Sequence, residues 1–462
     1  MAISTLLVAN RGEIAVRILR SAQDMGLRTV LAVSEADQES MAAGLADAVA
    51  VVGPAPAQKS YLNAEALVAA ALEHGCDAVH PGYGFLSENA AFARRVQEAG
   101  LTWVGPDPDV IDLMGHKTRA LEAAVAAGVP VLAGSGGPLE GDDDAVVALA
   151  REVGYPLVIK ASAGGGGRGI RLVRAEEALL RTVDTARSEA GASFGDTTVY
   201  LERFVERARH VEVQVLGDGE TFLHLGDRDC SLQRRSQKIV EEAPAPDLPD
   251  AVRERIRDSA VNLARLCRYT GVGTVEYLYD PARQEAAFIE MNTRLQVEHP
   301  VTEFVTGVDL VAEQLRIAST GRTALRQEDI AFGGHSVECR INAEDPERKF
   351  LPSPGSITRL DWPEGEDYRV DSGVRAGDTV APYYDSLLAK LIVHAEDREV
   401  AVQRMGAALA ATHVEGIRTT VPLLRRLVLD PVFTAVEHHT TWIETELLSD
   451  RPAEPPSEGS TP

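Results

Sequence analysis

The chain has 462 residues, of which 45% are hydrophobic, enough to bury a large core and to form two to four domains. Its 70 acidic and 46 basic residues give a formal charge of -24, which opposes binding to nucleic acid or to an anionic membrane surface. We find no run of about 18 apolar residues and no signal-peptide pattern, so we expect a soluble, cytoplasmic protein.

The first segments alternate between strand and helix. TLLVAN and RTVLAVS are typical of strands, and an amphipathic helix ending at Gly26 separates them. CDAVH and LTWVG continue the alternation. Residues 1–114 are therefore predicted to form an α/β domain with a parallel sheet. The first turn is not Gly-rich, which disfavours a dinucleotide site.

The next part of the chain becomes rich in β-structure. A helix in HKTRALEAAVAAG precedes a Gly-rich segment, and strands are expected from about residue 199 to 292, interrupted by a helix at 250–268. From HSVECRIN to about residue 446, short strands and helices mix. The proline-rich tail 447–462 is expected to be disordered. The predicted fold class is α/β together with α+β.

Cysteine and lysine usage narrows the possible sites. The four cysteines have no C-x-x-C spacing, so we expect reduced core thiols rather than disulfides or a zinc site. Lysines are rare in this arginine-rich chain, so each is a candidate for a site that needs a compact charge. The six lysines are Lys59, Lys117, Lys160, Lys238, Lys349 and Lys390. For Lys59 and Lys349, chance placement on the surface remains a reasonable interpretation.

Two segments indicate anion binding. AGGGGRG lies between the strand-like PLVIK and IRLV, which predicts a hairpin flap whose N–H groups could close over phosphates, with Lys160 at its foot. The alternative is a merely mobile hairpin. RDCSLQRRSQKIVEE concentrates Arg228, Arg234, Arg235 and Lys238, which suits an anion, although a solvated charged loop remains the alternative.

A pair of glutamates indicates a metal site. A hairpin centred near Arg283 would set Glu276 opposite Glu290, about 5 Å apart. Their repulsion, about 3 kcal/mol at an effective dielectric of about 20, would be removed by a divalent cation. With Asn292 the set is oxygen-only, as magnesium prefers. The alternatives are a solvated outer face and a protonated glutamate.

The polar face continues beyond Asn292 if the chain stays extended. Arg294 and Gln296 would follow at about 6.6 to 7 Å intervals, and Arg294 could clamp a small planar anion. Glu298, further from the metal, could act as a base. Glu338 and Arg340 share a strand face in SVECRIN, but the pattern does not place them near this site.

These segments, with VANRGEIAVRILR, HPGYGFLSEN and ECRINAEDP, resemble the biotin carboxylases, the ATP-grasp components of biotin-dependent carboxylases. The resemblance covers about residues 3–446. It implies an N-terminal Rossmann-like domain (1–114), an ATP-grasp domain (115–334, with a Gly-rich lid at about 130–204) and a C-terminal domain (335–446).

The resemblance also implies residue roles. The metal ligands would be Glu276, Glu290 and Asn292, the base Glu298, and the residue that stabilises the biotin enolate Arg340. The bicarbonate and biotin site would be formed by Lys238, Arg294, Gln296, Val297 and Arg340. The ATP site would be formed by Lys117, Lys160, Gly166, Gly167, Glu202, Arg203, Phe204, Val205, His210, Gln233, Ser236 and Glu276.

The implied reaction is the first half-reaction of an acyl-CoA carboxylase, such as the acetyl-CoA carboxylase of fatty acid biosynthesis. Bicarbonate, deprotonated by Glu298, would attack the γ-phosphate of ATP to give carboxyphosphate, which yields carbon dioxide and phosphate; the phosphate then takes the ureido proton of biotin. Magnesium, or manganese in its place, would assist. A biotin carboxyl carrier protein would present biotin, a carboxyltransferase would choose the final acceptor, and the chain would be a homodimer.

Two positions depart from the commoner family pattern, Ala163 in the flap and Ser236 near Lys238. The second puts a nucleotide contact in doubt. Another ATP-grasp carboxylate–amine ligase would fit the metal carboxylates and flap equally, and a nucleotide-sensing module without turnover is a further alternative. The R-L-Q-V-E-H run and Arg340 favour bicarbonate and biotin.

Overall fold

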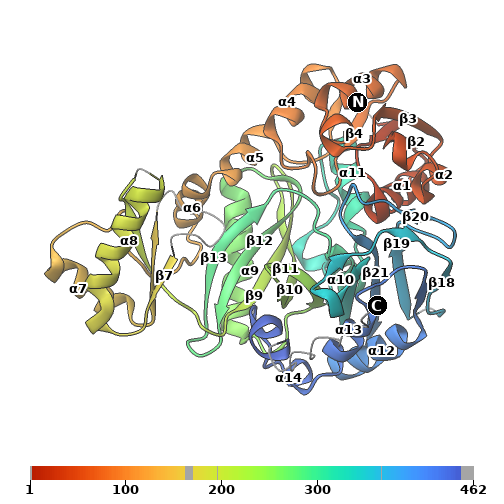
Figure 1. Cartoon of the computed structure of the whole chain (residues 1–462). Helices are drawn as coiled ribbons and strands as arrows, with labels where there is room; N and C mark the ends of the chain where they lie inside the picture. Colours follow the sequence, from red (N-terminus) through yellow and green to blue (C-terminus); the bar gives the residue numbers. More distant parts are fainter. Residues whose placement is uncertain (1–2, 162–169, 195, 366, 449–462) are drawn as a thin grey trace, which may run out of the picture.

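The computed structural model describes residues 3–161, 170–194, 196–365 and 367–448. Figure 1 shows a large body with one smaller lobe, formed around α7, α8 and β7, standing out at one end. Within the described residues, none of the helices combines the length and the apolar character that crossing a membrane requires.

The first domain is a five-stranded parallel sheet in the order β3-β2-β1-β4-β5, as the sequence predicts. Apolar strands alternate with helices whose apolar faces cover the sheet, and α1 buries Ile14 and Ile18 almost completely. The strands are β1 (Thr5–Val8), β2 (Arg28–Ser34), β3 (Ala48–Gly53), β4 (Ala78–His80) and β5 (Thr102–Trp103). The helices are α1 (Gly12–Asp24), α2 (Met41–Leu45), α3 (Ala64–Glu73), α4 (Ala90–Glu98) and α5 (Pro108–Gly115).

The small lobe has its own sheet and core. Its three antiparallel strands lie in the order β7-β6-β8, and α7 and α8 pack with them around Val146, Ile159 and Val183. Pairing of β6 with β7 confirms that the strands flanking the glycines form a hairpin. Helix α6 (Lys117–Ala126) precedes the lobe. The elements of the lobe are α7 (Asp143–Val153), β6 (Leu157–Ala161), β7 (Ile170–Val173), α8 (Leu179–Phe194) and β8 (Val199–Arg203).

The largest feature is one eight-stranded antiparallel sheet, in the order β13-β12-β9-β10-β11-β14-β21-β19. It runs without a break from the central β-rich region into the C-terminal part, so that β11 pairs directly with β14. Its strands are β9 (Arg209–Asp218), β10 (Phe222–Arg234), β11 (Gln237–Ala243), β12 (Thr270–Asp280), β13 (Glu285–Asn292), β14 (His335–Asn342), β19 (Tyr368–Ser372) and β21 (Leu387–Ala395). This continuity brings residues about 100 positions apart in sequence onto one face.

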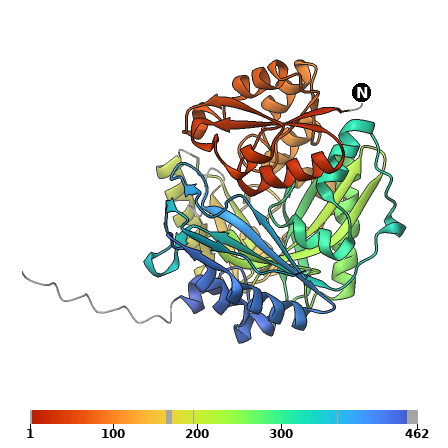
Figure 2. The same cartoon turned by 90° about the vertical axis from the view of Figure 1, so that its right-hand side faces the viewer.

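Helices cover this sheet on both sides. The bounds are α9 (Asp250–Leu266), α10 (His299–Thr306), α11 (Leu310–Thr320), α12 (Arg398–Ala411), α13 (Val421–Val428) and α14 (Pro431–Thr434). Figure 2 shows the first domain lying above the C-terminal strands. The contacts are made by α1, which touches both β19 and β21.

Short elements complete the described chain. The two-stranded ladders are β15 (Glu344–Asp345) with β16 (Leu351–Pro352), β17 (Gly355–Ser356) with β20 (Thr379–Val380), and β18 (Arg359–Asp361) with β22 (His413–Glu415). Single helical turns are η1 (Glu35–Asp37), η2 (Ala57–Lys59), η3 (Glu176–Ala178), η4 (Gln327–Asp329), η5 (Pro346–Arg348) and η6 (Ile443–Leu447). All four cysteines are buried and free, as predicted.

Candidate active site

Glu276 and Glu290 face each other across β12 and β13, as the sequence predicts. The route to this pairing differs from the predicted one. The hairpin pairs Asp280 with Glu285, a register in which Glu276 would meet Ile289, but a β-bulge in β13 adds one residue and brings Glu290 opposite. The pairing is confirmed, through a bulge that the sequence pattern did not indicate.

The side chains at this pair fit a hard divalent cation. Glu290 is exposed to the cavity and forms no hydrogen bond or ion pair with any described residue, and partial loss of hydration together with repulsion from Glu276 raises its pKa. Asn292 is buried and its Oδ1 lies 2.8 Å from Arg294 Nη2. Two carboxylates beside an amide oxygen are an oxygen donor set in which Glu290 has no described partner for its charge, and oxygen donors of this kind suit magnesium.

Lys238 joins this pair to the candidate base. From β11, its Nζ donates to Glu212 at 2.6 Å, to Glu276 at 2.9 Å and to Glu298 at 2.6 Å. Burial opposes the charge on Lys238, but the surrounding carboxylates raise its pKa well above the usual value. Lys238 therefore remains a cation in the interior and connects a candidate metal ligand with the candidate base.

Glu298 is held between two cations. It is fully buried at the start of α10, where Lys238 contacts Oε1 and Arg340 Nη2 donates to Oε2 at 2.9 Å. Burial alone would raise the pKa of Glu298, but Lys238 and Arg340 lower it. The carboxylate is therefore ionised and able to accept a proton. Arg340 is fixed from behind by Glu241, which its Nε contacts across the β11–β14 pair.

The predicted extended geometry beyond Asn292 is wrong. Strand β13 ends at Asn292 and the chain turns irregularly into α10 at His299. The turn brings the polar side chains together. Arg294 donates to Asn292 at 2.8 Å and to Gln296 at 2.7 Å, and Gln296 donates to Glu276 at 3.0 Å. Glu298 also lies closer to the carboxylate pair than an extended chain allows, because Lys238 bonds to both Glu276 and Glu298.

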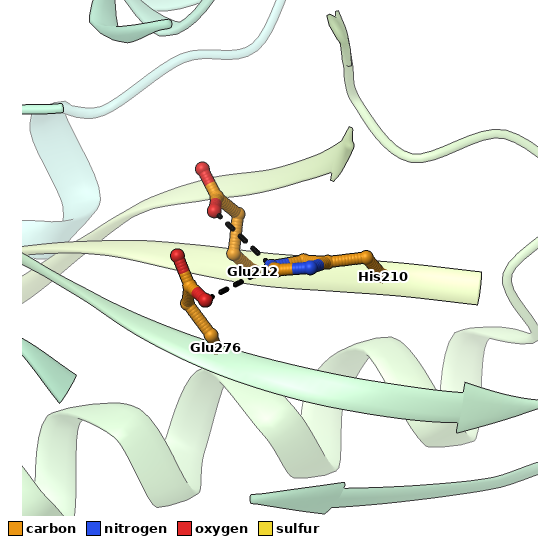
Figure 3. A group of neighbouring side chains, drawn as sticks. All are labelled: His210, Glu212 and Glu276. Atoms are coloured by element: carbon orange, nitrogen blue, oxygen red, sulfur yellow. Dashed lines mark ion pairs between the residues drawn. The ribbon is translucent and has the colours of Figure 1, made fainter. Parts of the chain in front are cut away.

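Figure 3 shows the His210 ring pointing at two carboxylates, those of Glu212 and Glu276. His210 Nε2 lies 3.2 Å from Glu276 and 3.7 Å from Glu212, while Gln233 contacts Nδ1 at 2.9 Å. Burial alone would lower the pKa of His210, but Glu276 raises it to about 9. His210 therefore adds positive charge next to the candidate metal carboxylates.

A cavity of about 880 Å³ opens over this cluster. The first domain contributes Tyr83 and Gly84 to its wall, and the C-terminal segment contributes Thr440 and Thr441. The predicted site residues that line it are Lys238, Arg294, Gln296, Val297, Arg340, His210, Gln233, Ser236, Glu276, Glu290 and Asn292. A volume of this size suits a nucleotide-sized ligand with a small second substrate.

Other predicted ATP-site residues lie in or near the small lobe, away from the lining of this cavity. Lys117 is exposed at the start of α6, Lys160 pairs with Glu202 across β6 and β8, and Arg203 pairs with Glu285. Phe204 is partly exposed and Val205 is buried. Gly166, Gly167 and Ala163 lie outside the described residues.

Ser236 lies in the two-residue turn between β10 and β11. Arg235 and Ser236 have φ values of 49° and 63°, the conformation of a tight hairpin turn. The Arg235 N–H donates to Glu444 Oε1 at 2.7 Å, which ties the turn to the C-terminal segment. Ser236 is exposed and lines the cavity, where its hydroxyl is accessible to a ligand.

The grouping of Arg228 with the anion-binding cations is wrong. Arg228 is 0% exposed and donates to Glu212, to Gln214 at 2.7 Å and to Thr302 at 2.9 Å, so its donors serve the protein interior. Arg234 lies over the Phe350 ring at 3.8 Å rather than beside Lys238. Of the four cations in that segment, only Lys238 both lines the cavity and bonds to the buried carboxylates.

Sequence reasoning missed three acidic residues at the site. Glu212 was detectable, because the alternation HVEVQV places it on the same strand face as His210. Glu88, which accepts from Arg294 at 2.8 Å, and Glu241, which holds Arg340, come from distant segments. Only the packing of the first domain and the pairing of β11 with β14 bring them in.

Comparison with known proteins agrees with this geometry. Residues 2–111 match the family described as biotin carboxylase, N-terminal domain; residues 116–326 match the ATP binding domain of the carbamoyl-phosphate synthase L chain; and residues 338–445 match the biotin carboxylase C-terminal domain. The biotin carboxylase of Pseudomonas aeruginosa is 50% identical over 447 residues, covering 96% of this chain and 99% of the relative. Biotin carboxylase 1 of Bacillus subtilis is 48% identical, covering 96% and 98%.

Solved structures give the same result. The biotin carboxylase domain dimer of the Hydrogenobacter thermophilus 2-oxoglutarate carboxylase, in complex with MgADP, ADP and bicarbonate, is 46% identical with a TM-score of 0.84, covering 98% of this chain and all of the other. The Campylobacter jejuni biotin carboxylase in complex with β,γ-ATP is 43% identical with a TM-score of 0.85, covering 96% and 98%. With all three domains matched and near full-length relatives at about half identity, the chain belongs to the biotin carboxylase family.

Proposed function

We propose that this chain uses ATP and bicarbonate to carboxylate biotin carried by a separate protein, through a carboxyphosphate intermediate. One observation carries the assignment of roles: a single buried carboxylate, Glu298, is held between Lys238 and Arg340, and both of these cations line the cavity. An ionised carboxylate held in this way can take up a proton, and Arg340 keeps part of its guanidinium for a second anion.

In the first step Glu298 acts as general base. Bicarbonate gives its proton to Glu298, and its oxygen attacks the γ-phosphorus of ATP as the bond to ADP breaks, forming carboxyphosphate. Arg294 and Lys238 line the cavity within reach of a small anion, and both are held by carboxylates that fix their side chains. Arg294 presents the planar fork that a carbonate anion fits.

The metal belongs to the same step. Glu276, Glu290 and Asn292 would hold magnesium, which when bound supplies positive charge to the phosphates of ATP. His210 and Gln233 form the adjoining wall of the cavity, where they can orient the nucleotide. Lys160, from the small lobe, and Lys117, from the start of α6, would approach the phosphates, and closure of the Gly-rich lid would exclude water from the labile intermediate.

In the second step carboxyphosphate divides into carbon dioxide and phosphate. The phosphate takes the ureido proton of biotin, the ureido nitrogen attacks carbon dioxide, and carboxybiotin forms. Arg340 would stabilise the negative charge that develops on the biotin oxygen. Its guanidinium lines the cavity and is anchored through Glu241, which leaves part of its donor set facing the substrate.

The partners follow from this chemistry. A biotin carboxyl carrier protein would bring biotin, and a carboxyltransferase would pass the carboxyl group to the final acceptor. A homodimer in the cytoplasm is the expected assembly, since a related domain was solved as a dimer. The domain limits 1–114, 115–334 and 335–446 remain our proposal for the division of the chain.

Phosphate release and carboxybiotin formation test the function together. The purified chain, with MgATP, bicarbonate and free biotin, should release phosphate only when bicarbonate is present, and should form carboxybiotin. Phosphate release that depends on an amine instead of bicarbonate would assign the chain to another kind of ATP-grasp ligase.

A further inference from the structure

Lys390 is a lysine to which neither the sequence nor the proposed reaction gives a role. Of the six lysines, all within the described residues, it alone is fully buried, at 0% exposure. Burying a lysine requires partners that compensate for the lost hydration. The residues that contact Lys390 therefore indicate its role.

The sheet sets Lys390 in a row with two other charged residues. Register pairing places it opposite Arg340 on β14 and opposite Asp371 on β19. Directly opposite residues in adjacent strands share a face. That face is covered by α1 and α10, so Lys390 points toward the first domain and toward the residues that lead into α10.

Three groups from three parts of the chain meet its ammonium. Lys390 Nζ donates to the Val297 carbonyl oxygen at 2.8 Å, and lies 3.2 Å from Glu13 on α1 and 3.6 Å from Asp371. Glu13 in turn accepts a hydrogen bond from Tyr83, which lines the cavity. The ammonium thus connects the first domain, the C-terminal sheet and the segment that carries Glu298.

The Val297 carbonyl belongs to the irregular segment 293–298, named here the base loop. This loop lies between β13 and α10 and has no strand partners to fix it. Val297 immediately precedes Glu298, so holding its peptide group restricts where the Glu298 side chain starts. A carbonyl left without this donor would lose a charge-assisted hydrogen bond.

We propose that Lys390 is a positioning residue for the base loop: by holding the Val297 carbonyl it fixes Glu298 and the bicarbonate site, and makes both depend on the docking of α1. The proposal rests on the proposed roles of Val297 and Glu298. Asp371 does not need Lys390 as its only cation, because Arg369 donates to both of its oxygens at 2.8 Å. Glu13 and the base loop depend on it more directly.

The proposal is tested by measuring the KM values of the Lys390→Met variant. Methionine keeps the length of the side chain but has neither its charge nor its hydrogen-bond donors. Loss of one hydrogen bond to a charged group should raise the KM for bicarbonate by about tenfold to a hundredfold in ATP cleavage. The KM for ATP should stay within about twofold, because a single lost contact in this loop leaves the nucleotide wall of the cavity in place. If Lys390 has only a structural role, Lys390→Met should lower the amount of active enzyme and leave both KM values unchanged.

A matched control is Arg253→Met on α9. Arg253 also pairs with a buried carboxylate, Asp227 at 2.7 Å, and donates to a backbone carbonyl, that of Ala245 at 2.9 Å, while Arg257 still serves Asp227. It contacts no residue of the base loop. This variant should lower stability without raising the KM for bicarbonate.

A second variant covers failure of the first to fold. Lys390→Met with Glu13→Gln removes the carboxylate that would lose its cation, and should show the same rise in the bicarbonate KM, whereas Glu13→Gln alone should show less of it. An unchanged bicarbonate KM in either Lys390 variant, or failure of both to fold, would overturn the positioning role. If the unmodified chain shows no bicarbonate-dependent ATP cleavage, it is instead the proposed function that fails.

Discussion

At the scale of single residues, the site is a set of buried carboxylates that cations hold in place. Lys238 contacts three of them and Arg340 two. Truncating one partner of a buried charge pair leaves the other uncompensated, so substitutions here act both on chemistry and on folding. Isosteric changes that remove only a charge separate the two effects.

Glu298→Gln tests the base. The amide keeps the shape, and its single oxygen still accepts a hydrogen bond from Lys238 or from Arg340, but it cannot take the bicarbonate proton. We expect ATP to bind normally while bicarbonate-dependent phosphate release falls by about 100-fold to 10,000-fold, the usual range for a lost general base. Near-normal phosphate release in this variant would place the base elsewhere and leave Glu298 a structural role.

Arg340→Ala should give a different kinetic pattern. Arg340 is proposed to act after carboxyphosphate forms, so carboxybiotin formation should fall more steeply than bicarbonate-dependent phosphate release, by an electrostatic contribution of about 3 to 4 kcal/mol. Both products are measured in parallel. Since Arg340 also contacts Glu298, some loss of phosphate release is expected; an equal loss of both products would argue against a specific role at biotin.

Glu276→Gln and Glu290→Gln test the metal site. A neutral amide is a poorer ligand for a hard dication, so each variant should need more magnesium for ATP cleavage. Glu290→Gln is the cleaner test, because Glu276 also pairs with Lys238 and His210. The double variant should be far less damaged than the product of the singles, since both act through one ion. Unaltered magnesium dependence in Glu290→Gln would contradict the assignment.

At the scale of elements, the pairing of β11 with β14 is decisive. It joins the sheet of the ATP-grasp region to the C-terminal strands and sets Glu241 opposite Glu338, both fully buried. Burial raises the pKa of Glu241 to about 7 and that of Glu338 well above its usual value. The next residue on β11, Glu242, points to the other face of the sheet, where it bonds to His335 on β14 and to Arg398 at the start of α12.

Glu242 should make the free energy of unfolding depend on pH in the acid range. Burial would raise its pKa, but His335 and Arg398 lower it from 4.5 to about 2, which corresponds to about 3 kcal/mol. Because the pKa of Glu242 is lower in the folded state, its carboxylate stabilises the fold fully at pH values above 4.5, the pKa in the unfolded chain. This contribution to the free energy of unfolding is lost as the pH falls through about 2. Glu242→Gln should therefore reduce the unfolding free energy at pH 7, and the difference should shrink in acid.

Urea unfolding at neutral and acid pH measures this difference. Glu415→Gln, which removes an exposed pair with Arg359, is the control and should change little at either pH. If Glu242→Gln lowers the free energy of unfolding equally at both pH values, the charge of the Glu242 carboxylate is not what stabilises the packing of α12 on β11.

At the scale of the whole molecule, the site needs all three regions. The first domain supplies Glu88 and Tyr83, the ATP-grasp region supplies the carboxylates and Lys238, and the C-terminal sheet supplies Arg340. The small lobe stands apart from these in Figure 1, joined to the body near α6. Its residue Lys160, and Lys117 at the start of α6, would have to approach the cavity to reach a bound nucleotide.

The chain should act on biotin attached to another protein. None of its six lysines has methionine on both sides, and Lys390 is buried, so we predict that the chain itself is never biotinylated. A streptavidin blot of the purified protein should be negative, with the purified carrier protein as the positive control. A positive signal at the mass of this chain would contradict the prediction.

The sequence by itself determined the layers of the fold and most of the chemistry. Apolar alternation located the parallel sheet, the strands and the main helices, and the spacing of the β12–β13 hairpin predicted the pairing of Glu276 with Glu290, because local patterns report on local structure. Tertiary structure alone decided what no local pattern encodes. The bulge at Ile289 set the register, the end of β13 broke the predicted extended run, and β11–β14 pairing brought Arg340 and Glu241 to Glu298. Those contacts join residues far apart in sequence, and their positions depend on how whole elements pack.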